Sequence, residues 1–457
     1  MPGHPLTLER LQLGSIIAPD QGGGTYDFYL AKDATGVEGT ERLDSKHFNV
    51  LLGRIHEKDR VWEELERRRG PIMDKMATMV EPFEEHYIRY DAEPEVDHYY
   101  DDVSRALAPT RSGWDAFPRE ALFGGIPFAK YIDCVRVLMG FALKHMDFCV
   151  LLGNRNTTIN PINIVAVPCK WIEACRYVAY ALDISETESE QLMLMTSITP
   201  ENAEYHFSTP SGPFASHFMI GKGSAVRLLT GCLDNPFHFM LRELRRKYRD
   251  DWDRSVDSRE PVFRDELIAL FSHFSQVVFF NSSINIVTDI GKTDIDAFAF
   301  DSVAKVAGIF QLKWQEQFAG SMRERESRKT NFLKNGNAWV EKVSKWIESG
   351  KMPQTLVSLG LPKHVANSIT ETRIFVIGRN FSHFSGEFQT DLRAAWGTWS
   401  QLLRLVESPA EGKSPLTILF DLIRQDSPVT RSKHSGEGEE IRIDGLRLII
   451  HPPGGAK

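Results

Sequence analysis

The chain has 457 residues, a formal net charge of −8 at pH 7 and 42% hydrophobic residues. This length allows two or three domains, and this apolar content is enough for buried cores, which argues against a disordered or fibrous protein. The five cysteines show no CxxC pairing, so neither a disulfide framework nor a cysteine-rich zinc site is expected.

The start of the chain and its most apolar stretch bear on its location. The first residues lack a basic stretch that leads into an apolar segment, so no signal peptide is expected. The most apolar window, residues 135–153, contains Lys144, His145 and Asp147, which a bilayer-spanning helix does not usually tolerate at its centre. We therefore expect a core helix there, no membrane partner and a cytoplasmic location.

The region before residue 256 is predicted to be mainly helical. Residues 1–45 show little periodicity and are expected to form an N-terminal arm or a small hairpin module. Residues 56–90 have helical spacing, with Gly70-Pro71 as the expected break between two helices. Residues 46–255 are predicted to form a helical domain that recognises DNA or a partner protein.

The periodicity of residues 256–380 predicts an α+β core. Residues 261–275 have helical spacing, and residues 276–287 are typical of one broken strand or two short ones. The elements expected after them are strands at 294–300 and 308–314, a long charged helix at about 323–348, and a fourth strand at 372–378. The predicted order is therefore helix, three strands, helix, strand.

The C-terminal region, residues 381–457, is predicted to form helices and a β-hairpin that pack on this core. Helical spacing covers residues 393–406 and 416–425. Asp444-Gly445 lies between alternating apolar residues within 439–451, which predicts a two-residue hairpin turn.

Polar residues gather on two neighbouring strands of the predicted core. Side chains alternate along a strand, so Asp294 and Asp296 should project together from one strand, and Gln311 and Lys313 from the next. If the strands pair as a hairpin, these four polar groups converge on one surface. The residues expected to face the other way, into a core, are Ile295, Phe310 and Leu312.

This set of groups suits phosphodiester hydrolysis. Mg²⁺ prefers oxygen ligands and keeps several waters, so one or two carboxylates and a substrate phosphate are enough to bind it. The cation polarises a phosphoryl oxygen and lowers the pKa of a bound water, while a lysine orients that water or neutralises developing charge. Asp296 is the predicted main metal ligand, Gln311 and Asp294 are further ligands, and Lys313 is the predicted catalytic lysine.

In these residues and in the order of its elements, the chain resembles the PD-(D/E)XK nuclease superfamily. The resemblance implies a restriction-endonuclease-like αβββαβ core, Mg²⁺ or Mn²⁺ as cofactor, and an acidic residue on the first helix. For that residue Glu266 is favoured slightly over Glu260. The family usually has Asp or Glu where this chain has Gln311, which offers only a neutral oxygen. Asp294 is the natural compensating carboxylate, and Asp289 is a more distant one.

A basic segment follows the Gln-x-Lys strand. The total charge is negative, but its distribution decides more than its sum, and residues 322–345 carry an excess of lysine and arginine. Such a helix beside the site could hold a phosphate backbone. The residues expected to contact nucleic acid are Arg323, Arg325, Arg328, Lys329 and Lys334.

These patterns lead to one main hypothesis and two alternatives. The main hypothesis is a Mg²⁺-dependent endodeoxyribonuclease that serves host defence or DNA processing, and a homodimer is left open because enzymes that cut both strands often work in pairs. The first alternative, motivated by Gln311 and the acidic net charge, is an inactive nuclease fold that binds DNA or protein. The second is a structural helical interaction protein, in which the four polar residues do not converge.

Overall fold

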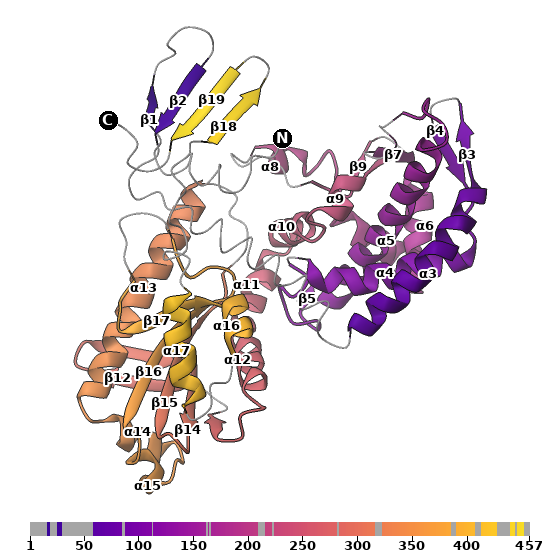
Figure 1. The fold of residues 1–457 in the computed structure, drawn as a ribbon. Helices are drawn as coiled ribbons and strands as arrows, with labels where there is room; N and C mark the ends of the chain where they lie inside the picture. Colours follow the sequence, from indigo (N-terminus) through magenta and orange to yellow (C-terminus); the bar gives the residue numbers. More distant parts are fainter. Residues whose placement is uncertain are drawn as a thin grey trace. The chain divides into compact units, whose positions relative to one another are not determined.

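The computed structural model divides the chain into two compact units, Lys46–Arg259 and Met1–Ser45 with Glu260–Lys457 (Figure 1). Each unit is described by itself below. The residues that the structure describes are 16–18, 25–29, 58–84, 87–111, 113–160, 163, 166–208, 215–221, 224–280, 283–315, 322–384, 390–406, 413–426, 439–443 and 446–451. For residues 16–18, 25–29, 58–59, 257, 322–326, 439–443 and 446–451, the description covers the backbone only. The fold is a mixture of α-helices and β-sheets.

The unit Lys46–Arg259 is built on the long helix α5 (Phe128–Gly153), which packs against α3 (Lys58–Met79) and α4 (Pro94–Leu107). Its other helices are η1 (Ala108–Thr110), α6 (Trp171–Leu182), α7 (Glu186–Leu194), α8 (Ala203–Phe207), α9 (Leu229–Leu233), α10 (His238–Lys247) and α11 (Arg249–Asp257). A four-stranded sheet has the order β7 (Ala166–Cys169), β10 (Ala225–Leu228), β9 (Phe218–Ile220), β8 (Ser197–Ile198). Two short hairpins are β3 (Val80–Phe83) with β4 (Tyr87–Tyr90), and β5 (Leu122–Phe123) with β6 (Ile126–Pro127).

Two features of this unit bear on the sequence predictions. The apolar window 135–153 lies within α5 and is largely buried, so the expected core helix is confirmed. The expected break at Gly70-Pro71 is wrong, because α3 continues through both residues. Ile72 and Met76 are buried against α4 and α5, and this packing outweighs the low helix propensity of glycine and proline. Among the helices of the described segments, none has the length and apolar character that crossing a bilayer requires.

The core of the other unit is a five-stranded mixed sheet. Its order is β11 (Val277–Phe279), β14 (Ala297–Asp301), β15 (Val306–Lys313), β16 (Glu371–Gly378), β17 (Ala394–Thr398). The pairs β11–β14 and β14–β15 are antiparallel, and β15–β16 and β16–β17 are parallel. A separate hairpin, β12 (Ile284–Thr288) with β13 (Gly291–Ile295), precedes β14.

Helices cover both faces of this sheet, which explains why its central strands are almost continuously apolar. On one face, α13 (Met322–Glu348), α14 (Met352–Ser358) and α15 (Lys363–Ala366) contribute to a core with Phe298, Ile309 and Val376. On the other, α12 (Arg259–Leu270), α16 (Trp399–Val406) and α17 (Pro415–Gln425) pack on Phe310, Leu312 and Phe375.

One expected element is present and two differ from the structure. Of the two alternatives for residues 276–287, the two short strands are found, as β11 and β12, which belong to different sheets. The expected strand at 294–300 is interrupted at Asp296, which lies between β13 and β14. The expected helix at 393–406 begins only at Trp399, because residues 394–398 form the buried strand β17. Burial between two helical layers selects a strand there, although the apolar spacing also fits a helix.

The two ends of the chain meet in one sheet. The expected C-terminal hairpin is confirmed by the antiparallel pairing of β18 (Glu439–Ile443) with β19 (Leu446–His451), although the turn residues 444–445 lie outside the described residues. β1 (Ile16–Ala18) pairs with β2 (Thr25–Tyr29), and β2 runs parallel to β19. The two hairpins were predicted in separate regions of the chain, whereas the structure joins them in one sheet.

Candidate metal centre

Three carboxylates from three different segments meet beside the five-stranded sheet. Glu260 lies in the first turn of α12, Asp294 lies on β13, and Asp296 lies at the bend between β13 and β14. One oxygen of each carboxylate lies within 4.8 Å of those of the other two. Glu260 and Asp294 are exposed, whereas Asp296 is completely buried. The cluster therefore joins one buried acid to two that solvent can reach.

Backbone and side-chain donors fix the position of Asp296. Its amide N–H donates to the carbonyl of Phe310 at 3.1 Å, which holds the bend against β15. Its Oδ2 accepts from the backbone N–H of Leu312 at 2.6 Å and from the side-chain amide of Gln311. Its Oδ1 is buried and has no hydrogen-bond donor among the described residues. Asp296 therefore presents one bound and one unsatisfied oxygen.

The surroundings of Asp296 favour its neutral form. Burial and the neighbouring Glu260 raise the pKa of this carboxyl to about 8, although Lys313 and the Leu312 amide lower it. Glu260 offers only acceptor oxygens when it is ionised, so a proton held between the two carboxyls supplies the missing donor. Near neutral pH the metal-free cluster therefore retains a proton that a bound cation would displace.

The spacing of the three carboxylates fits a small divalent cation. Oxygens that ligate Mg²⁺ at about 2.1 Å in an octahedron lie roughly 3 Å apart when adjacent and roughly 4.2 Å apart when opposite. The carboxylate oxygens of the cluster lie at most 4.8 Å apart. This upper limit exceeds the distance between opposite ligands by less than about 1 Å. An all-oxygen donor set is the kind that hard divalent cations prefer, so these three acids could hold a metal ion.

The structure brings Gln311 and Lys313 to this cluster from β15. Both lie on the same face of the strand as Ile309, and Lys313 is close enough for its charge to lower the Asp296 pKa. The convergence expected for Asp296, Gln311 and Lys313 is therefore present. The expected role of Gln311 as a metal ligand differs from what is seen, because its amide nitrogen donates to Asp296. Ligation through its oxygen requires the amide to turn over.

Asp294 reaches the cluster through an anchor that the sequence analysis did not identify. The indole Nε1 of Trp339 on α13 donates to the backbone carbonyl of Asp294 at 2.6 Å, and this tryptophan is buried in the core. Ile295 was expected to face the same side as Phe310, but it packs in the core on the opposite face of the sheet. The bend at Asp296 interrupts the alternation of side chains and causes this difference.

Glu266, the favoured helical acid, lies in a different environment from Glu260. Its carboxylate pairs with the guanidinium of Arg379, which follows β16. Arg379 is itself stacked near aromatic rings, with Trp314 closest at 4.6 Å. Glu266 lies about 9 Å along the helix axis from Glu260 and about 120° around it, so the two cannot both face the aspartates. The structure thus places Glu260, and not Glu266, in the acidic cluster. Asp289, the more distant alternative, lies 4.0 Å from Lys345.

The basic residues of α13 differ in exposure. Lys334 is exposed, Arg328 is partly exposed, and Lys329 is buried, so Lys329 does not present its charge to solvent as a phosphate contact would require. Arg323 and Arg325 lie in α13, but their side chains are outside the described residues. Among the expected contacts whose side chains are described, Lys334 and Arg328 are those that nucleic acid could reach.

Comparisons of the chain with models of protein families, with curated proteins and with solved structures found no match. The chemistry of the site must therefore be argued from its own geometry.

Proposed function

We propose that this chain is a divalent-cation-dependent nuclease that hydrolyses DNA phosphodiester bonds. The observation that carries the proposal is the cluster of Glu260, Asp294 and Asp296, whose carboxylate oxygens lie within 4.8 Å of one another. Asp296 contributes a buried oxygen that has no donor in the described segments, and Lys313 lies on the same face of the sheet. A hard-cation site beside a lysine is the arrangement that phosphoryl transfer to water requires.

The order of elements supports a restriction-endonuclease-like core for this proposal. α12 precedes the antiparallel strands β11, β14 and β15, and α13 then leads to β16, which lies parallel to β15. With the β12–β13 hairpin inserted after β11, this order resembles the αβββαβ arrangement of the PD-(D/E)XK superfamily. On this resemblance, Glu260 corresponds to the acidic residue on the first helix of that core.

Each residue of the cluster has a distinct role in the proposed reaction. Glu260, Asp294 and Asp296 hold Mg²⁺ or Mn²⁺, which polarises the phosphoryl oxygen and lowers the pKa of a bound water. Lys313 orients the attacking water and offsets the negative charge that develops on the phosphoryl group. Gln311 acts as a positioning residue, because its amide fixes Oδ2 of Asp296, while Oδ1 has no donor among the described residues.

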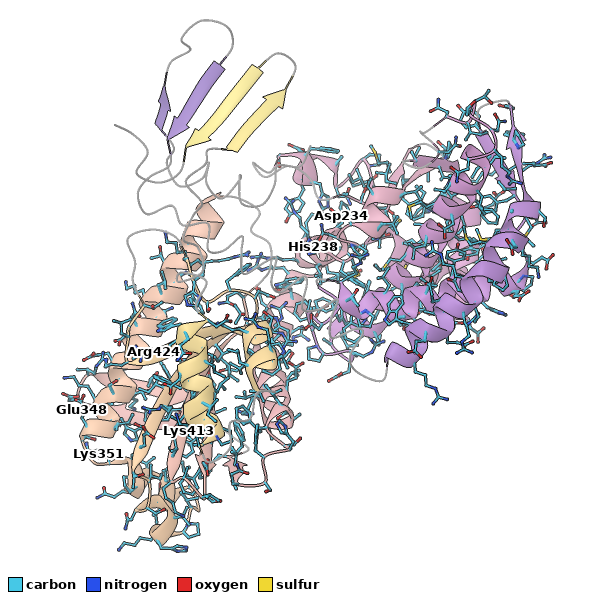
Figure 2. The ribbon with its side chains drawn as sticks, in the orientation of Figure 1. Asp234, His238, Glu348, Lys351, Lys413 and Arg424 are labelled. Carbon is cyan, nitrogen blue, oxygen red and sulfur yellow. The ribbon has the colours of Figure 1, made fainter. Side chains whose placement is uncertain are left out.

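A plasmid-nicking assay tests this proposal. We expect nicking with Mg²⁺ or Mn²⁺ that EDTA abolishes, and a loss of about 100-fold or more in Lys313→Ala, because one charge-stabilising group is removed. Lys351→Ala is the matched control, since Lys351 is an exposed lysine of the same unit, beyond the end of α13 (Figure 2). Equal activity of wild type and Lys313→Ala, or equal activity with and without EDTA, would overturn the proposal.

A second candidate function rests on Gln311. Its neutral side chain adds no negative charge, and its amide nitrogen rather than its oxygen faces Asp296, which favours a nuclease fold that binds DNA without cutting it. Calorimetry separates the two functions. Binding of DNA without detectable binding of Mg²⁺ or Mn²⁺ supports the binding module, and saturable binding of either cation supports the nuclease.

A further inference from the structure

A buried arginine in the unit Lys46–Arg259 has no ionic partner among the described residues. Arg227 lies on β10, is 4% exposed, and stacks its guanidinium 3.4 Å from the ring centroid of Phe141 on α5. The ring of Phe218 lies 5.3 Å away. Its Nε and Nη1 are buried and have no hydrogen-bond acceptor in the described part of the chain. The two aromatic rings stabilise the cation but accept none of its in-plane N–H groups.

The ionisable groups that interact most with Arg227 are neutral. They are Cys232, Cys169, Tyr90 and Tyr177, and no carboxylate is among them. Burial raises the pKa of Cys232 and of Tyr177 to about 12, and it also raises the pKa of Cys169 and of Tyr90. None of them therefore supplies a negative charge at pH 7, whereas a guanidinium stays protonated in proteins.

A second buried cation nearby takes the available acid. Lys144 lies 5.0 Å from the centroid of the same Phe141 ring and forms an ion pair with Asp97. The neighbouring His145 is neutral at pH 7, because burial lowers its pKa to about 4. Lys144 and Arg227 thus both lie against the Phe141 ring, and of these two cations only Lys144 has a carboxylate partner among the described residues.

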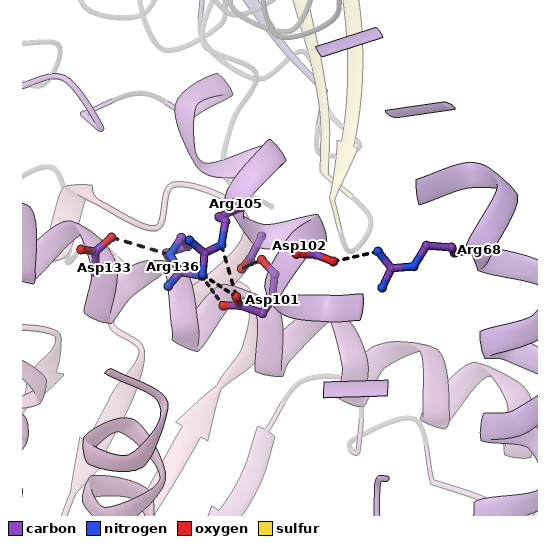
Figure 3. Close-up of polar contacts among 7 residues, drawn as sticks. Arg68, Asp101, Asp102, Arg105, Asp133 and Arg136 are labelled. Atoms are coloured by element: carbon purple, nitrogen blue, oxygen red, sulfur yellow. Dashed lines mark hydrogen bonds and ion pairs between the residues drawn. The ribbon is translucent and has the colours of Figure 1, made fainter. Parts of the chain in front are cut away.

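Another buried arginine of this unit is neutralised by carboxylates, as is usual for buried cations. Arg136 is 8% exposed and pairs with Asp101, and its Nε lies 3.7 Å from a carboxylate oxygen of Asp133 (Figure 3). Removing a cation from water is unfavourable unless an anion and acceptor atoms replace the lost hydration. Arg136 has both within the chain, and Arg227 has neither among the described residues.

We propose that Arg227 binds an oxyanion, the phosphate or carboxylate group of a small ligand, between β10 and α5. Phosphate and carboxylate oxygens are the acceptors that guanidinium binds best, and they supply the missing negative charge. The aromatic side chains of Phe141 and Tyr177, whose ring centroids lie 5.4 Å apart, provide apolar surface for the rest of the ligand. This site lies in a different unit from the acidic cluster and does not depend on the proposed nuclease activity.

Calorimetric melting of the full chain tests the proposal with inorganic phosphate and with acetate, each against sodium chloride at equal ionic strength. We expect one or both oxyanions to raise the melting temperature of the wild type saturably, by about 2–4 °C or more. Arg227→Met should lose this rise, because methionine keeps much of the apolar side chain but removes the donors. Arg136→Met is the control and should keep the rise, even if its own melting temperature is lower.

A second experiment does not depend on the folding of Arg227→Met. Equilibrium dialysis measures directly whether the wild type binds radiolabelled phosphate or radiolabelled acetate. We expect saturable binding of about one anion per chain, and affinity about tenfold lower in Arg227→Lys, because lysine lacks the planar donor set. The preferred anion then identifies the ligand group. Binding of neither anion to the wild type, or an equal rise in melting temperature in Arg227→Met, would overturn the proposal.

Discussion

Each unit of this chain buries one ionisable side chain in an unusual environment, the acid Asp296 in one and the base Arg227 in the other, with different consequences. Asp296 lies beside two further acids, and Arg227 lies beside a second cation and neutral groups. Asp296 can become neutral by keeping a proton, since its pKa is raised to about 8. Arg227 has no such option because a guanidinium stays charged. Asp296 can therefore stay buried without a ligand by keeping its proton, whereas Arg227 keeps a charge that the proposed oxyanion would balance.

The largest expected effect comes from Asp296→Asn. The unfolded carboxyl loses its proton near pH 4, whereas the folded one keeps it up to about pH 8. The free energy of unfolding of the metal-free wild type should therefore fall as pH rises through this window, by at most about 1.4 kcal/mol per pH unit. Asparagine cannot ionise, so in EDTA the variant should be more stable than wild type at pH 8, by up to about 5 kcal/mol.

Urea unfolding in EDTA at pH 5 and pH 8 measures this difference. The advantage of Asp296→Asn should be small at pH 5 and several times larger at pH 8, while nicking activity falls by about 100-fold or more because a cation ligand is lost. A variant that is no more stable than wild type at pH 8 would mean that the buried carboxyl is ionised without cost. The contrast with Arg227 would then disappear.

The next effect distinguishes the two glutamates of α12. Glu260→Gln should abolish the rise in melting temperature that Mn²⁺ gives, because it removes one ligand of the cluster. Glu266→Gln should keep that rise but lower the melting temperature itself, because Arg379 loses its carboxylate partner. We expect a cost of about 1–2 kcal/mol, less than for a fully buried pair, because the Glu266 side chain is partly solvated.

Differential scanning calorimetry with and without Mn²⁺ measures both properties in each variant. The reverse result, with Glu266→Gln insensitive to Mn²⁺ and Glu260→Gln responsive, would move the cation site to the Arg379 side of α12. It would also show that Asp296 lacks the acidic neighbour on which the comparison of the two buried charges depends.

A further prediction concerns protons released by cation binding. Because Asp296 is protonated below about pH 8, binding a divalent cation must displace its proton. The affinity for Mn²⁺ should therefore increase with pH up to about 8, by as much as about tenfold per pH unit, and then level off. Titration calorimetry at pH 7 in two buffers of different ionisation enthalpy should give about one proton released per cation. Release of no proton would place the cation away from Asp296.

The sequence predicted the parts of the acidic cluster that depend on local rules. The alternation of side chains along a strand placed Gln311 and Lys313 together, and hairpin pairing brought them to Asp296. The choice between Glu260 and Glu266 could not be made in this way, because helical spacing does not show which turn of a helix faces a strand. The bend at Asp296 also has no sequence signal, and it turned Ile295 to the other face.

Arg227 was not predicted as a site for a similar reason. It packs against Phe141, which belongs to a distant segment of the chain, and Asp97, the acid beside the same ring system, pairs with Lys144 instead. Both are tertiary facts, and no spacing along the sequence reports them. Strand β17 illustrates the same limit, because only its cover of helices distinguishes a buried strand from a helix of equal apolar content.

The smallest expected effect concerns exposed cations, which, unlike Arg227, keep their hydration in the folded protein. Lys334 is exposed and already hydrated, so pairing it with a phosphate gains little beyond the release of a counterion. Lys334→Ala should weaken DNA binding only about two- to fivefold and reduce the slope of log affinity against log salt by about one. Lys329, which is 6% exposed on the same helix, should instead affect folding stability and leave that slope unchanged when replaced by methionine. DNA binding measured at several salt concentrations distinguishes the two variants. An unchanged slope in Lys334→Ala would exclude Lys334 on α13 from the proposed DNA contact, because each lysine–phosphate contact releases a counterion and so contributes to the slope.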